Sequence, residues 1–142
     1  MDEPIDVLVV EDDPYDVEII GRQLAADFPH ARVKWIDDGE RALRFLLGFG
    51  EPAQLPKLVL LDLHLPRMDG LEVLERLRAD RLTKYLPVVV LTGTLPDAAR
   101  TRRAYALGAN SYVAKPSSQD EYIKSVRSVV AYWLQQNVPP GE

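Results

Sequence analysis

The sequence predicts an α/β fold in which a parallel β-sheet lies between two layers of helices. Segments typical of strands and helices alternate five times, which requires crossover connections between parallel strands. Residues 58–61 and 86–91 are apolar throughout, as expected for strands that helices cover on both faces. A length of 142 residues, 46% hydrophobic and 27% charged, suits one globular domain with a full core.

Turn and capping residues mark where the elements begin and end. Strands are predicted over residues 5–10, 31–36, 58–62, 86–91 and 111–114. The first helix should begin at Pro14, since the N–H that proline lacks has no partner in the first turn, with Asp13 as its N-cap. Further helices are predicted after Gly39, after Gly70, over 97–107 and over 118–136. Gly108 fits a helix end, and two Gly and two Pro make 48–57 a loop.

Composition and charge exclude several classes of protein. A net charge of -5 and a pI near 5.1 disfavour nucleic acid as a partner, because binding it requires clustered cations. The lack of cysteine excludes disulfides and thiolate chemistry and suits a reducing compartment. No apolar run approaches the roughly 20 residues that cross a bilayer, and the acidic start Met1–Pro4 has the wrong sign for a signal peptide. We therefore expect a cytoplasmic protein that binds neither membrane nor nucleic acid.

Polar residues that can carry chemistry follow four of the predicted strands. These are Glu11 and Asp12 after the first strand, Asp62 at the end of the third, Thr92 after the fourth and Lys115 after the fifth. The carboxyl ends of parallel strands open on the same side of a sheet, at the crevice where the strand order reverses. We therefore expect these side chains to share one pocket.

The residue types in this pocket suit metal binding and phosphoryl transfer. Two carboxylates about 4 Å apart repel by about 4 kcal/mol at an effective dielectric constant of about 20. A bound divalent cation would offset this repulsion. Oxygen ligands that leave room for water and phosphate favour Mg²⁺. Lys115 provides a compact cation for a phosphoryl oxygen, Thr92 a hydroxyl and Asp62 a carboxylate nucleophile. Taken singly, each has a structural alternative: Asp62 could cap a helix, and Lys115 could be a solvated surface residue.

A resemblance to the receiver domain of two-component response regulators rests on Glu11-Asp12, Asp62 with Pro66 and Asp69-Gly70 after it, Thr92, and Lys115-Pro116. It covers essentially the whole chain and implies a flavodoxin-like fold, with five helices around a sheet of strand order 2-1-3-4-5. It also implies that the chain is a signalling protein, not an enzyme, which accepts a phosphoryl group on Asp62 from a histidine kinase. The resemblance implies that Asp12, Asp62 and the backbone carbonyl of His64 bind Mg²⁺, with Glu11 acting through water. It implies that Thr92 and Lys115 bind the phosphoryl group. It also implies that Tyr112 is an aromatic switch residue that moves after Thr92. Taken singly, Tyr112 is also a plain strand aromatic.

A narrower resemblance is to phytochrome-associated single-domain response regulators. It rests on the segments 48–57, 61–66, 87–92 and 132–134. It implies one receiver domain over 1–142, with a core of about 5–136, a tail over 137–142 and no output domain. A bacteriophytochrome is then a candidate kinase, and output would run through protein–protein interaction, a change of dimer, or relay to a phosphotransfer protein.

The sequence fits three other functions less well than it fits a phosphorylation-dependent signalling switch. A pseudo-receiver that has lost phosphorylation is disfavoured by the complete set of Asp12, Asp62, Thr92 and Lys115. A Mg²⁺-dependent phosphatase with an aspartyl intermediate would need a second acid two residues after Asp62, where this chain has His64. An FMN-binding protein would need a phosphate loop rich in Ser, Thr and Gly after the first strand, which is missing.

The last predicted helix carries an unusually wide apolar surface. One stripe consists of Tyr122, Val126, Val129 and Trp133, and Ile123, Val130 and Leu134 widen it. A wide apolar surface on a monomer often marks a contact site, which predicts a homodimer through this helix. The alternative is a stripe that faces the core, with Trp133 folded over the edge of the sheet.

Overall fold

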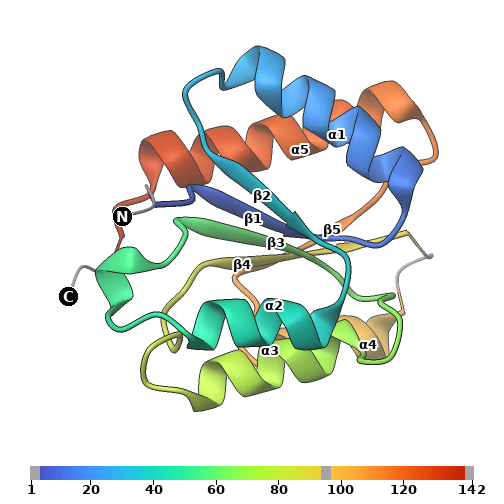
Figure 1. Cartoon of the computed structure of the whole chain (residues 1–142). Coiled ribbons are helices and arrows are strands. Elements are labelled where there is room, and N and C mark those ends of the chain that lie inside the picture. Colours follow the sequence, from blue (N-terminus) through green and yellow to red (C-terminus); the bar gives the residue numbers. More distant parts are fainter. Residues whose placement is uncertain (1–3, 94–96, 140–142) are drawn as a thin grey trace.

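Five parallel strands form one sheet in the order β2-β1-β3-β4-β5, which confirms the expected flavodoxin-like topology (Figure 1). The computed structural model describes residues 4–93 and 97–139. The strands are β1 (Val7–Val10), β2 (Val33–Ile36), β3 (Leu58–Asp62), β4 (Val88–Thr92) and β5 (Ser111–Ala114). The helices are α1 (Pro14–Asp27), α2 (Gly39–Leu47), α3 (Gly70–Ala79), α4 (Ala98–Ala106) and α5 (Gln119–Ala131), with short turns η1 (Pro52–Gln54) and η2 (Tyr132–Gln136).

The helices form two layers, with α1 and α5 on one face of the sheet and α2, α3 and α4 on the other (Figure 1). Successive side chains of a strand point to opposite faces, so each central strand serves both layers. In β1, Val7 and Val9 belong to the core under α1 and α5, whereas Leu8 and Val10 belong to the core under α2 and α3. Every residue of β1, β3 and β4 is buried, which explains why these strands are apolar apart from the terminal Asp62 and Thr92.

Side-chain caps begin all five α-helices. Asp13 accepts a hydrogen bond from Tyr15 N at 2.9 Å ahead of Pro14, as predicted. The equivalent caps are Asp38, Asp69, Asp97 and Ser118. Each cap pairs an N–H that has no partner inside the helix, so helix starts lie where the short polar residues are. At the other end of α4, Gly108 has a φ of 104°, which favours glycine and stops the helix there.

Some boundaries differ from the prediction. β4 begins at Val88 and not at residue 86, because Leu86 N pairs with Thr83 O in the preceding turn and Pro87 has no N–H. The last helix is α5 followed by a π-helical turn, η2, and the loop 48–57 contains η1. Among the described residues, no helix has the length and hydrophobicity needed to cross a membrane. The acidic start Met1–Glu3 and the tail after Pro139 lie outside the described residues.

The apolar stripe of the last helix faces the sheet. Tyr122 and Val126 are only 5% and 2% exposed and pack in the core between the sheet and α5. Val129 and Trp133 are partly buried against the same cluster. The prediction that Tyr122 and Val126 make a dimer contact is therefore wrong: the face of the sheet that carries Val7, Val9, Leu58, Leu60, Val89 and Leu91 is wide enough to take this stripe as its cover.

Candidate functional site

The side chains of Glu11, Asp62 and Lys115 meet at the carboxyl ends of the strands. Lys115 Nζ lies 2.6 Å from Glu11 Oε1 and 3.2 Å from Asp62 Oδ2. Their side chains are 12%, 3% and 8% exposed, in the order Lys115, Glu11, Asp62, so all three are largely withdrawn from water. They line an open hollow of about 480 Å³ together with Asp12, Asp13, Pro14, Asp16, His64 and Gly93. The structure thus brings together acids and a lysine that are 53 and 104 residues apart in sequence.

Backbone pairing at the strand ends sets these positions. Asp62 is the last residue of β3, and its Oδ1 accepts a hydrogen bond from His64 N at 2.9 Å, which orients the carboxylate at the start of the loop. Lys115 follows β5, and its N donates to Thr92 O at 2.7 Å, which ties the ends of β5 and β4 together. Glu11 N donates to Ile36 O at 3.1 Å in the same way at the end of β1.

Three acids in the hollow form a cluster suited to a cation. Carboxylate oxygens of Glu11, Asp12 and Asp62 lie within 4.8 Å of one another. Glu11 and Asp62 are buried, whereas Asp12 is exposed, so the cluster is open on one side. Hard oxygen donors with room for water suit a divalent metal ion.

The groups around Asp62, the proposed nucleophile, keep its carboxylate ionised. Burial raises the pKa of Glu11 to about 8, and a hydrogen bond with Asp62 adds to this effect. Burial also opposes the charged form of Asp62, but hydrogen bonds from Glu11 and from His64 N, together with Lys115, hold the pKa of Asp62 below its ordinary value. The pKa of Lys115 is raised because contacts with Glu11 and Asp62 outweigh burial. A proton is thus kept on Glu11, while Asp62 is negative and Lys115 positive.

Thr92 and Tyr112 lie on neighbouring strands, on the same face of the sheet. Thr92 is 1% exposed at the end of β4. Tyr112 pairs with Val90 in the sheet register, two residues before Thr92, so both side chains project toward the α4 layer. The Tyr112 ring packs against that core, with its centroid 6.5 Å from the ring of Tyr105 on α4. An aromatic side chain on the same face as Thr92 thus contacts α4.

Sequence reasoning missed two residues that contact Lys115. Asp16 Oδ2 lies 2.9 Å from Lys115 Nζ, and the Tyr122 ring centroid lies 5.7 Å from it. An Asp in the first turn of a helix is common for helix stability alone, so the sequence had no separate signal for Asp16. The sequence pattern placed Tyr122 in an apolar stripe expected to form a dimer contact, so its position beneath the site was not predicted.

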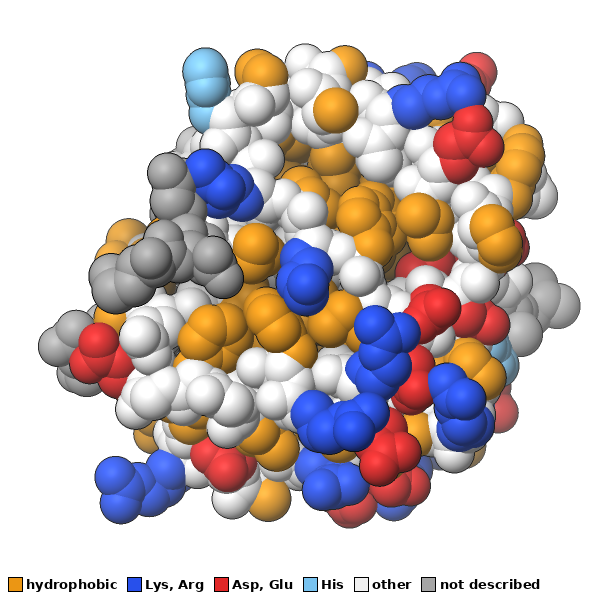
Figure 2. All heavy atoms as spheres, in the orientation of Figure 1, with side chains coloured by type: hydrophobic (Ala, Val, Ile, Leu, Met, Phe, Trp, Pro, Cys, Tyr) orange, Lys and Arg blue, Asp and Glu red, His pale blue; other side chains and the backbone are white. Residues whose placement is uncertain are grey.

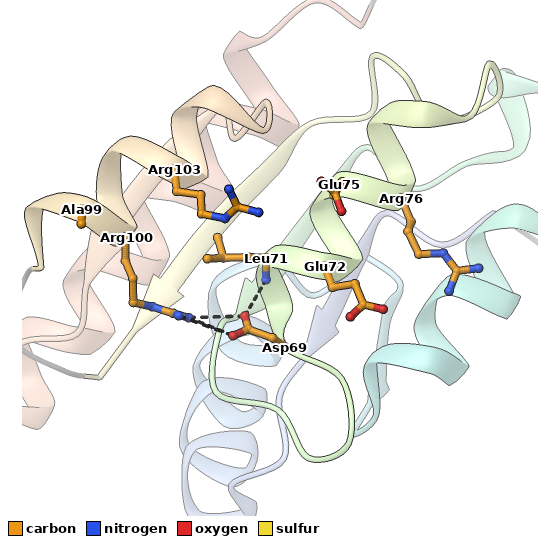
Figure 3. Close-up of a pocket in the computed structure, with 8 residues that line it drawn as sticks. All are labelled: Asp69, Leu71, Glu72, Glu75, Arg76, Ala99, Arg100 and Arg103. Atoms are coloured by element: carbon orange, nitrogen blue, oxygen red, sulfur yellow. Dashed lines mark hydrogen bonds and ion pairs between the residues drawn. The ribbon is translucent and has the colours of Figure 1, made fainter.

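A second hollow, of about 510 Å³, lies between α3 and α4 (Figure 3). Asp69, which caps α3 through Leu71 N at 2.8 Å, also receives hydrogen bonds of 3.3–3.5 Å from the Arg100 guanidinium on α4. Arg103, Glu72, Glu75 and Arg76 line the rest of the hollow, with Leu71 and Ala99. The contact joins α4 to the loop that leads away from Asp62.

Intermingled acidic and basic side chains cover the surface over the amino ends of α2 and α3, at the lower right of Figure 2. The ion pairs there include Arg41 with Asp37 at 3.0 Å and Arg67 with Asp38 at 2.5 Å. Among the described residues other than glycine, Arg67 alone has a positive φ, 66°. The pair with Asp38 holds this strained loop, which follows Asp62, against α2.

Comparison with known proteins agrees with this fold and site. The chain belongs to the response regulator receiver domain family, whose model matches residues 7–127. It is 38% identical over 141 residues to the probable methanogenesis regulatory protein FilR2 of Methanothrix harundinacea, covering 99% of this chain and 90% of that protein. It is 33% identical over 137 residues to the response regulator Rcp1 of Synechocystis, covering 95% of this chain and 92% of Rcp1.

Solved structures of such relatives superimpose closely on the chain. The phosphorylated cyanobacterial phytochrome response regulator RcpA has a TM-score of 0.87 at 31% identity, with 98% of this chain and 100% of RcpA covered. The Mn²⁺-bound form of Rcp1 has a TM-score of 0.86 at 30% identity, with 97% and 100% covered. The chain is thus a two-component receiver domain that resembles single-domain, phytochrome-associated response regulators such as Rcp1 and RcpA.

Proposed function

We propose that this chain is a phosphorylation-dependent signalling switch in which Asp62 accepts a phosphoryl group. The observation that carries the proposal is the contact of 3.2 Å between Lys115 Nζ and Asp62 Oδ2 beside the acidic cluster. A nucleophilic carboxylate, a metal site and a cation for the phosphoryl oxygens are the parts that such a transfer needs.

The transfer itself is a displacement at phosphorus. An oxygen of Asp62 attacks the phosphorus of a phosphohistidine on the kinase; the new O–P bond forms as the N–P bond breaks, and the electron pair returns to the imidazole. Asp12, Asp62 and the His64 carbonyl would hold Mg²⁺, with Glu11 acting through water, and the bound ion would neutralise charge on the transferring group. Lys115 would hold one phosphoryl oxygen and the Thr92 hydroxyl would donate to another.

The response would pass from Thr92 to Tyr112. These residues share a face of the sheet, and the Tyr112 ring already touches the α4 layer. Movement of Thr92 toward the phosphoryl group would open space that Tyr112 can fill, and this would change the surface that α4 and β5 present. Output would then be protein–protein contact, a change of dimer, or relay to a phosphotransfer protein.

The proposed donor is a sensor histidine kinase in the cytoplasm, and a phytochrome-type kinase is the specific candidate because the similar protein RcpA is described as a phytochrome response regulator. A homodimer through the last helix and the segment after it would use the large apolar side chains that remain exposed there, Tyr132 and Val138, which are 51% and 85% exposed. Light scattering of the wild-type chain and of Tyr132→Ala tests this, since an unchanged monomer mass for both would rule the dimer out.

The decisive experiment is incubation with Mg²⁺ and acetyl phosphate, followed by intact mass spectrometry. We expect a gain of one phosphoryl group in the wild-type chain and none in Asp62→Asn. No gain in either protein would favour a pseudo-receiver. Repeated turnover of phosphate esters would favour a phosphatase.

A further inference from the structure

Asp16 is a third acidic partner of Lys115, outside the acidic cluster. Its Oδ2 lies 2.9 Å from Lys115 Nζ, closer than Asp62 Oδ2 at 3.2 Å. Asp16 lies in the first turn of α1, and its side chain is 19% exposed. The free N–H groups at the start of a helix favour a negative charge at this position.

The ammonium group of Lys115 is held on several sides. It has three N–H donors, and the carboxyl groups of three acids lie within contact distance: Glu11, Asp16 and Asp62. The ring of Tyr122, on α5, lies 5.7 Å from Nζ and adds a cation–π contact. The four partners come from the ends of β1 and β3 and from α1 and α5, which form one layer on the sheet (Figure 1).

Two of the three acids that contact Lys115 have a second proposed role. Glu11 and Asp62 belong with Asp12 to the cluster that fits a divalent ion, and Asp62 is also the proposed phosphoryl acceptor. A carboxylate that coordinates a metal or is bonded to phosphorus is a weaker partner for an ammonium group. Asp16 is not in the cluster, so its contact with Lys115 is the one that metal and phosphoryl binding leave in place.

We propose that Asp16 is a positioning residue of the phosphorylation site. It keeps Lys115 beside Asp62 through a contact that does not use a metal ligand, and it weakens the hold of Lys115 on Glu11 and Asp62, so that these acids can turn to the metal. The inference rests on the proposed function, because it assigns Asp16 a part in preparing that site for Mg²⁺.

The test is the affinity of the unphosphorylated chain for Mg²⁺, measured by isothermal titration calorimetry at one pH and ionic strength. In Asp16→Asn, Lys115 has only Glu11 and Asp62 as acidic partners and competes with the metal for them. We expect the dissociation constant for Mg²⁺ to rise about tenfold, equivalent to about 1.4 kcal/mol. Asp16→Glu keeps the charge and should recover most of the affinity.

Asp13→Asn is the matched control. Asp13 lines the same hollow and carries the same charge, but its carboxylate accepts from Tyr15 N and is not among the acids that contact Lys115. Asparagine also preserves the N-cap. We expect less than about a twofold change in this variant, since only a solvent-screened, through-space effect is lost.

Equal losses in Asp16→Asn and Asp13→Asn would show that charge alone matters and would overturn the proposal, as would an unchanged affinity in Asp16→Asn. A double-mutant cycle with Lys115→Met adds a second test: without the lysine, Asp16→Asn should cost no more than Asp13→Asn. Circular dichroism checks folding, and Asp16→Ser replaces Asp16→Asn if the latter does not fold. A wild-type chain that binds Mg²⁺ but is not phosphorylated by acetyl phosphate would overturn the proposed function, while the titrations would still decide the role of Asp16.

Discussion

Gly70 lies directly against the backbone of Asp62: a Cβ atom at Gly70 would be 2.6 Å from the Asp62 carbonyl oxygen and 2.7 Å from the Cα of Leu63. Gly70 N also donates to Leu63 O at 3.0 Å. The start of α3 is therefore packed on the end of β3 with no room for a side chain. This contact fixes the position of Asp62, the proposed phosphoryl acceptor.

Gly70→Ala should accordingly destabilise the chain and slow phosphorylation of Asp62. Backbone atoms on both sides would have to move, so we expect a loss of about 1–3 kcal/mol in the free energy of unfolding, measured with urea. Gly50→Ala is the control, because Gly50 is exposed and its nearest neighbour would be the flexible Gln54 side chain at 3.5 Å. A change within about 0.5 kcal/mol is expected for the control; equal effects of the two substitutions would contradict the packing argument.

The affinity for Mg²⁺ should rise with pH. Burial raises the pKa of Glu11 to about 8, so the metal-free site keeps a proton on Glu11 at neutral pH, and a divalent ion must displace that proton. We expect the affinity to increase between about pH 6 and pH 8 and to level off above that range. Calorimetry in buffers of different ionisation enthalpy measures the proton release directly, and Glu11→Gln should abolish it.

The stability of the metal-free chain should have the opposite dependence on pH. The ordinary pKa of Glu11 is 4.5 and its folded value is about 8, so the unfolded chain loses this proton first. The stabilising contribution is complete below pH 4.5 and is lost as pH rises through about 8. Urea unfolding in the presence of EDTA should therefore show a decline toward high pH that is reduced in Glu11→Gln. A decline of the same size in that variant would count against the assignment.

Arg78 should be important for stability although it lies outside the site. Its guanidinium donates to Gly108 O at 2.9 Å, Thr83 O at 3.0 Å and Asn110 Oδ1 at 3.0 Å, which joins the loop before β4 to the loop before β5. Arg78→Ala should lower the free energy of unfolding by about 2–4 kcal/mol, since three acceptors, of which Thr83 is buried, lose a charged donor. The exposed Arg81 provides the comparison, and Arg81→Ala should have little effect.

Tyr122→Phe should not destabilise the chain. The Tyr122 hydroxyl is buried and has no hydrogen-bond partner among the described residues. Removing an unpaired buried hydroxyl should leave stability unchanged or raise it by up to about 1 kcal/mol, whereas Tyr122→Ala should cost about 3–5 kcal/mol through the cavity it leaves. Thermal unfolding of both variants decides this, and a clear loss in Tyr122→Phe would indicate a partner for the hydroxyl.

Local patterns were sufficient for most of the fold. Unbroken apolar runs in β3 and β4 and short polar caps such as Asp13 predicted where the elements lie, because burial on both faces and helix capping act over a few residues. The family resemblance supplied the strand order. The positions of Asp62 and Lys115 at the ends of parallel strands had already grouped them in one pocket, and the 3.2 Å contact agrees with that grouping.

The sequence by itself determined the order of the elements and the residues at the strand ends, since each depends on neighbours in the chain. Only the tertiary structure decided which face α5 presents to the sheet, and this choice buries Tyr122 and Val126. It also decided which acid besides Glu11 and Asp62 reaches Lys115. The reason is physical: a wide apolar stripe fits a core or an interface equally well, and an acid in the first turn of a helix has the same local signature whether or not a lysine from 99 residues away packs beside it.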